Sequence, residues 1–304
     1  MKKLTKYEPY KRFNVKENGF YGSYYKPEID NYQGKCLIVF GGSMGSFMLT
    51  ELCAEKFYEA GLNVIAVAFR DCEGLPDELH DIPLETVGNC IKWAKENVAD
   101  KVGVWGISLG GQLALTLGVY YKDYVSLVVA VNPMHYYQQG MTSLKKLEFL
   151  NCSCWTFNGK PLPYYSISVT SDEFKKQTKK DARKLHEFIC YSEFYKREYE
   201  NLDKTASYMI PVEEIKGSVL LLSAGEDRLL PSVDICNAVS ARLEENGFKY
   251  PYKHITYDVE SHYLTPAKPL TAKIFRVERK NPEMCDKNRL KSFNDTLEFI
   301  KNGW

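Results

Sequence analysis

Short runs of hydrophobic residues alternate with longer amphipathic segments between residues 35 and 131. The runs carry almost no charge, which is typical of strands that are covered on both faces. The amphipathic segments have the length of helices and end at glycine or polar residues. We expect strands at 36–40, 63–69, 101–105 and 125–131, and helices at 47–60, 84–98 and 110–121. Strands separated by helices imply parallel crossovers, so the pattern predicts a mostly parallel, doubly wound α/β sheet.

The strand–helix pattern breaks at residue 133 and resumes at residue 212. Residues 133–211 are rich in Tyr, Lys and Phe and show no buried-strand pattern. A segment of about eighty residues is too long for an unstructured loop in a compact domain. Further elements are expected after it: strands at 218–223 and 253–259, and helices at 233–245 and 288–300. The sequence therefore predicts one α/β domain, formed by 1–132 and 212–304, that carries 133–211 as a cap or lid.

Composition narrows the classes of function and the compartment. The 304 residues have a formal net charge of +1, so no global field favours nucleic acid. The aromatic share of 13% includes 22 Tyr, which suits a pocket or lid with amphipathic surfaces. No apolar run is long enough to span a membrane, and no apolar stretch follows the N-terminal lysines. The nine cysteines are irregularly spaced, so we expect reduced thiols in a cytoplasmic protein.

Two of the cysteines lie close together in the sequence. Cys152 and Cys154 are two residues apart, but no histidine or cysteine at metal-binding spacing flanks them. We therefore expect structural thiols there, and no metal site in the chain.

A short glycine-flanked serine motif carries the strongest chemical signal. Gly106, Ser108 and Gly110 fit the pattern G-x-S-x-G, between an apolar strand at 102–105 and a helical segment at 112–115. Such a strand–turn–helix exposes a nucleophilic serine on a sharp turn, and the helix N-terminus favours a developing negative charge. A serine before a glycine pair can also be an ordinary helix N-cap. The surrounding pattern favours Ser108 as the nucleophile.

A nucleophilic serine requires a base and a carboxylate that orients the base. Asp227 follows the apolar strand at 219–223, and His262 follows the strand at 255–259. All three residues thus lie beyond the carboxyl ends of strands, where open α/β sheets place their active sites. Glu226 is the alternative acid, but we favour Asp227.

The choice of base rests on position, because the chain has five histidines. The other four are His80, His135, His186 and His254. Of the five, His262 alone falls just beyond the last core strand. His135 and Tyr136 follow the strand at 125–131 at the correct end of the sheet, so they are candidates to contact the substrate. A purely structural role for His135 is the alternative.

The serine motif predicts an oxyanion hole made of backbone N–H groups. Leu109 supplies one donor, and the loop after the strand at 36–40 supplies another, through Gly42 or Ser43. Glycines in that loop allow the backbone to approach a carbonyl group closely. A phosphate-binding loop is the competing interpretation, but no Gly-Lys-Ser/Thr follows.

At these motifs the sequence resembles the C-terminal catalytic domain of acyl-CoA thioesterases and bile acid-CoA:amino acid N-acyltransferases. The resemblance covers most of residues 35–304. It is carried by F-G-G-S-M-G at 40–45, G-L-P-D-E-L at 74–79, V-W-G-I-S-L-G-G at 104–111, A-G-E-D at 224–227 and S-H-Y at 261–263.

The resemblance implies an α/β-hydrolase fold, with Ser108 as nucleophile, Asp227 as acid and His262 as base. It also implies an acyl thioester substrate. Members that transfer the acyl group to an amino acid have cysteine at the nucleophile position, so serine favours water as the acceptor.

We therefore expect a serine hydrolase that cleaves a small-molecule acyl thioester or ester. It would need no metal or redox cofactor, bind no nucleic acid and span no membrane; a homodimer is left open. Two alternatives stay open. One is a carboxylesterase or peptidase of the same fold, and the other is a non-catalytic binding module.

Overall fold

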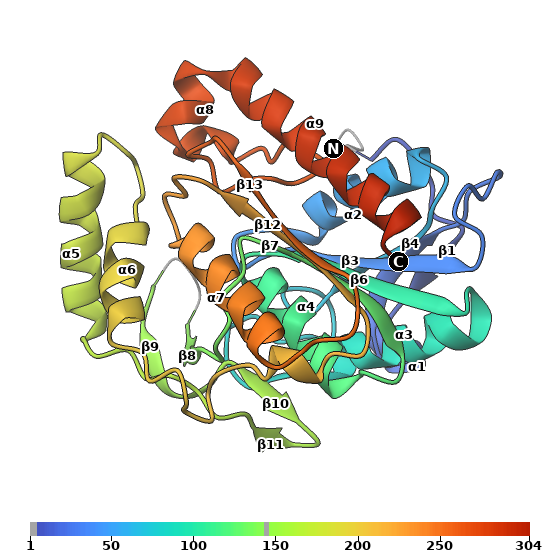
Figure 1. Ribbon diagram of the computed structural model, residues 1–304, viewed down its shortest axis with the longest axis horizontal. Coiled ribbons are helices and arrows are strands. Elements are labelled where there is room, and N and C mark those ends of the chain that lie inside the picture. Colours follow the sequence, from blue (N-terminus) through green and yellow to red (C-terminus); the bar gives the residue numbers. More distant parts are fainter. Residues whose placement is uncertain (1–4, 143–145) are drawn as a thin grey trace.

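The computed structural model describes residues 5–142 and 146–304 and is built around a central sheet of eight strands (Figure 1). The strand order is β1-β2-β4-β3-β6-β7-β12-β13. The six strands from β4 to β13 run parallel to one another, as the hydrophobic pattern predicts. They are β3 (Lys35–Phe40), β4 (Asn63–Ala68), β6 (Lys101–Ile107), β7 (Val125–Val131), β12 (Ser218–Ala224) and β13 (Tyr252–Tyr257).

Helices cover both faces of the sheet, and each face has its own hydrophobic core (Figure 1). One face holds α3 (Glu85–Asn97), α4 (Leu109–Tyr120) and α7 (Ser232–Glu245). The other holds α2 (Phe47–Glu59), α8 (Arg276–Lys280) and α9 (Pro282–Asn302). Neighbouring strand residues divide between the two cores, as Ile38 and Val39 do, because successive side chains point to opposite faces. Both faces are buried, which explains why the strands read as continuous apolar runs.

Two antiparallel strands at one edge of the sheet were not expected from the sequence. β1 (Lys11–Phe13) and β2 (Tyr21–Tyr25) flank the short helix α1 (Val15–Asn18), and β2 pairs with β4. The sequence of β2 is rich in tyrosine and contains a glycine, so it does not resemble an apolar run. Tyr24 and Tyr25 are nevertheless buried, and the Tyr24 hydroxyl donates a hydrogen bond to Asn63 Oδ1 over 2.7 Å. Part of the aromatic excess therefore belongs to the sheet edge.

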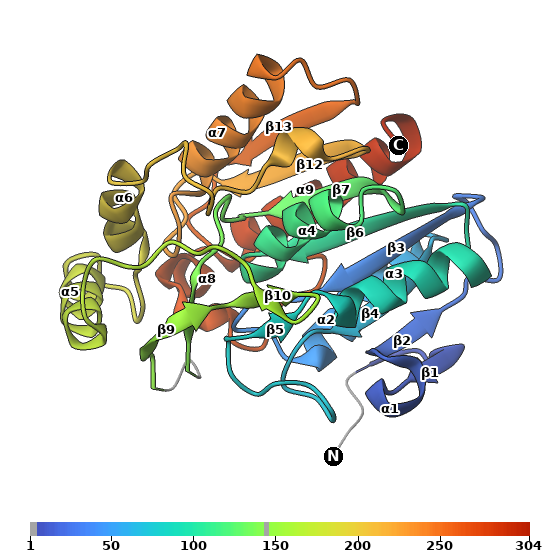
Figure 2. The same ribbon diagram turned by 90° about the horizontal axis from the view of Figure 1, so that it is seen from below.

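Residues 133–211 contain short strands as well as helices (Figure 2). The elements are β8 (Gln139–Met141), β9 (Phe149–Ser153), β10 (Trp155–Phe157), β11 (Lys160–Pro161), α5 (Ser171–Lys184) and α6 (Ser192–Glu200). β10 pairs in parallel with β5 (Ile82–Pro83), which precedes α3. Trp155 is fully buried, and its indole N–H donates to Gln112 Oε1 on α4. The first half of the segment is thus fastened to the main sheet domain, whereas α5 and α6 lie at its edge.

The C-terminal helix differs most from the expected boundaries. The sequence pattern predicts a start at residue 288, but α9 begins at Pro282. Proline is favoured in the first turn of a helix because its missing N–H would have no intrahelical acceptor there. Short 3₁₀ helices lie at Val212–Glu214 and Ala272–Ile274. In the part of the chain that the structure covers, no helix has the length and apolar character to cross a membrane.

Candidate active site

Ser108 lies at the sharp turn between β6 and α4, in a backbone conformation that few residues adopt. Its φ and ψ angles are 60° and −122°. A side chain at Gly106 would place its Cβ 2.2 Å from the Gly110 carbonyl oxygen, and one at Gly110 would place its Cβ 2.1 Å from the Gly41 oxygen. Only glycine therefore fits on either side of the turn. Ser108 occupies the N-cap position of α4, but its side chain makes no capping hydrogen bond, so capping does not explain this serine.

Asp227 and His262 form a buried hydrogen-bonded pair. Asp227 Oδ2 lies 2.7 Å from His262 Nδ1, and the two residues are 5% and 2% exposed. The Leu229 N–H donates to the other carboxylate oxygen over 2.8 Å, and the Ser232 hydroxyl donates to Oδ2 over 2.5 Å. These donors fix the carboxylate, which in turn fixes the imidazole ring with Nδ1 as its donor. Nε2 is then left to accept a proton.

The neighbouring acid takes no part in this pair. Glu226 has a largely exposed side chain that faces Arg228 over 3.4 Å. The acid that contacts His262 is therefore Asp227, which turns inward where Glu226 turns outward.

Asn132 connects the ends of three strands beneath the site. It is fully buried directly after β7, with a φ of 44°. Its Nδ2 donates to the His262 carbonyl oxygen over 2.7 Å, and its Oδ1 accepts the Ala224 N–H over 2.8 Å. The preceding residue, Val131, accepts the Ser108 N–H over 2.8 Å. The end of β7 thus contacts both the serine turn and the histidine loop.

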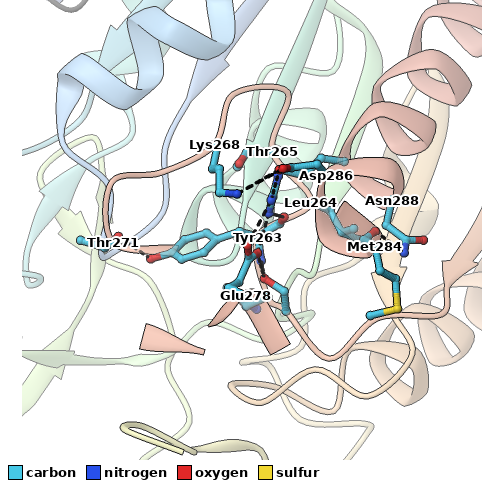
Figure 3. A network of polar contacts seen from close by, with 12 residues as sticks. Tyr263, Leu264, Thr265, Lys268, Thr271, Glu278, Met284, Asp286 and Asn288 are labelled. Carbon is cyan, nitrogen blue, oxygen red and sulfur yellow. Dashed lines mark hydrogen bonds and ion pairs between the residues drawn. The ribbon is translucent and has the colours of Figure 1, made fainter. Parts of the chain in front are cut away.

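A buried ion pair between Glu278 and Arg289 contacts the histidine loop, and Figure 3 shows Glu278 and Asp286 of this network beside Tyr263. Glu278 Oε1 lies 2.5 Å from Arg289 Nη1 and accepts the Ser261 hydroxyl over 2.6 Å. Arg289 also reaches the carbonyl oxygen of Tyr263 and the carboxylate of Asp286. The residues on both sides of His262 are therefore anchored to α8 and α9.

The loop after β3 packs directly against the serine turn. A Cβ at Gly42 would lie 2.8 Å from the Ile107 oxygen and 3.0 Å from Ser108 Cβ. The next residue, Ser43, lines the cavity at Ser108, and the Arg70 guanidinium donates to its carbonyl oxygen. Leu109 is the first residue of α4, so its N–H has no acceptor within the helix. The predicted oxyanion residues are therefore grouped around Ser108.

A cavity of about 240 Å³ opens at Ser108, and none of its lining side chains is charged. Ser43, Ser108 and Leu109 come from the turns just described, and Leu229 and Leu230 come from the Asp227 loop. Most of the remaining lining comes from residues 133–211: Met134, Gln138, Met141, Leu147, Phe174, Ile189, Tyr191 and Tyr195. The inserted segment thus supplies an apolar wall facing the serine.

His135 and Tyr136, the expected substrate contacts, are not among the residues that line this cavity. Both are buried, and the His135 ring packs on Tyr136 and Tyr199. Burial lowers the pKa of His135 to about 3, with smaller contributions from Lys204 and Arg242. The chain turns into the core after β7, so these two side chains pack beneath the site, and the aromatic wall is provided further along the chain.

Several residues that hold the site were not expected from the sequence. They contact Asp227 or the loop of His262 and do not line the cavity, and their spacing in the sequence follows no motif: Asn132, Ser232, Glu278 and Arg289. One signal existed for Asn132, since a polar residue followed by proline ends the apolar strand β7. For Arg70, Glu278 and Arg289 the sequence contains no comparable signal.

The contact between the Ser108 hydroxyl and His262 is not formed in the structure. Within residues 5–142 and 146–304, no hydrogen bond joins the Ser108 hydroxyl to His262, and His262 Nε2 has no hydrogen-bond partner. The histidine is thus oriented by Asp227 with a free nitrogen, on a loop that Asn132 connects to the strand beside Ser108.

A family model described as the C-terminal domain of BAAT and acyl-CoA thioester hydrolases matches residues 88–281. The chain belongs to this family. The matched region includes Ser108, Asp227 and His262, and it ends shortly before α9. A search of curated proteins found no match.

Solved structures with low sequence identity share the fold. MGS-M1, an α/β-hydrolase enzyme from a Medee basin deep-sea metagenome library, is 13% identical, with a TM-score of 0.53 and 95% of each chain covered. A Klebsiella pneumoniae protein assigned as a dienelactone hydrolase is 11% identical, with a TM-score of 0.54 and 93% of each chain covered. An acylaminoacyl peptidase from Pyrococcus horikoshii is 13% identical, with a TM-score of 0.51, covering 93% of this chain and 40% of the peptidase. The fold is that of the α/β hydrolases, and family and fold together identify the chain as a hydrolase.

Proposed function

We propose that this hydrolase cleaves acyl thioesters through a serine-bound acyl intermediate. The observation that carries the proposal is a juxtaposition at the carboxyl ends of the strands. Ser108 sits on a strained turn at an uncharged cavity, and a buried Asp227–His262 pair lies on the adjoining loops. A nucleophile, a base and an orienting carboxylate in this chain order are the components of acyl transfer in this fold.

The proposal assigns a residue to each step. Asp227 accepts a hydrogen bond from Nδ1 of His262, so Nε2 takes the Ser108 hydroxyl proton as the oxygen attacks the substrate carbonyl carbon. The resulting imidazolium returns this proton to the leaving thiolate, which departs as a thiol. Water then attacks the acyl-enzyme, His262 takes the water proton, and the proton passes to the Ser108 oxygen as the carboxylic acid leaves. The Ser–His contact is expected to close when substrate binds, since catalytic hydrogen bonds often tighten only in the complex.

The developing oxyanion would be stabilised by backbone donors. The Leu109 N–H lies at the N-terminus of α4, and Gly42 and Ser43 supply the backbone on the facing side. Removing one such donor typically lowers kcat by about 10²–10³. These donors need no side chain, so this part of the site depends on the loop conformation that Arg70 helps to hold.

The thioester assignment rests on the family and on the cavity. The family description names acyl-CoA thioester hydrolases, and the cavity at Ser108 presents apolar side chains suited to an acyl chain. The resemblance to acyltransferases that use cysteine as the nucleophile implies that the serine at position 108 favours water over an amino acid as the acceptor. The alternative is cleavage of an oxygen ester or an amide, because the same machinery serves these substrates.

A substrate panel distinguishes the alternatives. Purified protein is incubated with acyl-CoAs of increasing chain length, and free thiol is measured alongside cleavage of short aryl esters. Glycine and taurine are added in parallel reactions to detect acyl transfer. Thiol release that depends on chain length supports the proposal, whereas ester cleavage without thiol release from any acyl-CoA would overturn it.

The nucleophile is tested separately with a fluorophosphonate probe. We expect the parent chain to be labelled and Ser108→Ala to remain unlabelled. Equal labelling of both proteins would rule out Ser108 as the nucleophile, and an unlabelled, inactive parent would favour the non-catalytic binding module.

A further inference from the structure

A second group of reactive side chains lies where the inserted segment meets the main domain. His80 and Asp81 precede β5, and Cys152 lies on β9, about seventy residues later in the sequence. Backbone pairing holds the two stretches together: the Asp81 N–H donates to the Ser153 oxygen over 3.0 Å. Because the partners are remote in sequence, a search for neighbours of Cys152 along the chain could not find them.

The three side chains converge on one point. One ligand atom from each of His80, Asp81 and Cys152 lies within 4.8 Å of the other two. His80 Nδ1 is 3.0 Å from Asp81 Oδ2. Gly140 on β8 makes this approach compatible with the backbone, since a Cβ there would lie 2.8 Å from His80 Cβ and 2.9 Å from Cys152 Sγ. His80 and Cys152 are partly exposed and Asp81 is exposed, so an ion from solvent can reach the cluster.

We propose that His80, Asp81 and Cys152 form a zinc site, separate from the catalytic residues. Imidazole nitrogen, thiolate sulfur and carboxylate oxygen are the three ligand types that Zn²⁺ takes in proteins, and water can fill the fourth position. Magnesium and calcium prefer oxygen ligands alone. Ligand atoms about 2.0–2.3 Å from one zinc ion lie roughly 3–4 Å apart, so small side-chain rotations would close the site. Binding releases the Cys152 thiol proton to solvent.

A fourth residue is placed to orient the histidine. Glu78 Oε2 lies 3.4 Å from His80 Nε2, on the side of the ring away from Nδ1. With Nδ1 bound to zinc, the Glu78 carboxylate would accept a hydrogen bond from the Nε2 proton. A carboxylate on the second nitrogen is the usual support for a metal-bound histidine.

The site would act as a crosslink that supports the cavity. The ion would join the loop before β5 to β9, and β9 pairs with β8. Met141 at the end of β8 lines the cavity and exchanges two backbone hydrogen bonds with Leu79. Zinc would therefore hold together the wall that carries Met141, without contact with Ser108 or His262. The proposal does not depend on the substrate, because binding can be measured without catalysis.

Titration with Co²⁺ and Zn²⁺ tests the site directly. Metal-free protein is titrated with Co²⁺, whose thiolate coordination produces a charge-transfer absorption, and Zn²⁺ affinity is measured by calorimetry. We expect one ion per chain in the parent, with the charge-transfer band lost in Cys152→Ser. His80→Gln should weaken zinc binding by about tenfold to hundredfold or more. Cys72→Ser, at another partly exposed cysteine, is the matched control and should bind as the parent does.

Thermal unfolding gives a second readout that detects misfolded variants. Zinc should raise the Tm of the parent and of Cys72→Ser, and the same zinc concentration should raise the Tm of Cys152→Ser and His80→Gln by less. No saturable binding by the parent, or binding that survives both substitutions, would overturn the proposal. Because neither readout uses substrate, failure of the zinc site and failure of the thioesterase proposal can be told apart.

Discussion

Asn132 holds His262 by its main chain: the Asn132 Nδ2 atom donates to the His262 carbonyl oxygen over 2.7 Å. The oxygen of the same side-chain amide accepts the N–H of Ala224, shortly before the Asp227 loop. One buried side chain thereby ties together the loops that bear the proposed base, His262, and the proposed acid, Asp227. In the proposed mechanism Asn132 would position His262 without contacting the reacting atoms.

Asn132→Gly should lower kcat by about tenfold to hundredfold and leave KM nearly unchanged, because the base would lose its fixed position. Glycine tolerates the φ of 44°, so the change removes two hydrogen bonds without adding strain. Unfolding by urea should show a loss of about 1–3 kcal/mol. As a control, Asn246→Ala removes an exposed amide that donates to the Arg242 carbonyl oxygen, and it should alter neither kcat nor the free energy of unfolding. Full kcat in Asn132→Gly would mean that the loop holds its position unaided.

Asp227→Asn should reduce kcat by up to about 10⁴, because an amide can stabilise the wrong tautomer of His262 and cannot stabilise the imidazolium. Glu226→Gln is the matched control, as it changes the adjacent carboxylate, which is exposed and faces Arg228. The kcat of both variants is measured from the steady-state hydrolysis of the best substrate. A larger loss in Glu226→Gln than in Asp227→Asn would reverse the assignment of the acid.

His135 should make the protein less stable in acid. Burial lowers its pKa to about 3, whereas the unfolded chain titrates near 6.5, so below pH 6.5 the unfolded state binds one more proton. The unfolding free energy should fall by about 1.4 kcal/mol per pH unit from this residue as the pH drops toward 3. Urea unfolding at pH 7, 5.5 and 4.5 should show a weaker pH dependence for His135→Gln. An unchanged pH dependence would show that the folded and unfolded states bind a proton at His135 equally well.

Arg289→Met should destabilise the protein by about 3–5 kcal/mol, because it leaves the buried Glu278 carboxylate without its partner. The double variant Glu278→Gln/Arg289→Met should recover much of this loss, since no unpaired charge is left. Lys268→Met, which removes an exposed partner of Asp286, should cost under about 1 kcal/mol. Chemical denaturation of the four proteins tests this order, and a double variant less stable than Arg289→Met alone would contradict it.

The parallel core could be predicted because each strand is buried on both faces and so appears as an apolar run. The serine turn could be predicted because it requires glycine on both sides of Ser108. The family was expected from a resemblance at several motifs, and the match of the family model over residues 88–281 confirms it. The tyrosine-rich strand β2 was not predicted, since its residue pattern does not distinguish an edge strand from a loop. The short strands of residues 133–211 were not predicted either. β10, for example, is fixed by its pairing with β5, which lies about seventy residues earlier in the sequence.

One part of the candidate site could be predicted from the sequence, and the lining of its cavity could not. Asp227 and His262 were expected from their places after core strands, and the structure brings them within 2.7 Å of each other. The lining of the cavity could not be foreseen, because it depends on how the chain turns after Asn132. His135 and Tyr136 turn into the core, while Phe174, Tyr191 and Tyr195 come forward from residues with no motif of their own.

The pairing of β10 with β5 divides the inserted segment into parts with different freedom to vary. Trp155 and its strand belong to the framework, so their removal would open the core beneath α4. The stretch 171–200, with α5 and α6, is joined to the framework by few main-chain bonds and still provides Phe174, Tyr191 and Tyr195 to the cavity. Exchanging this stretch between family members would be a way to graft a new acyl preference onto an unaltered Ser108 turn.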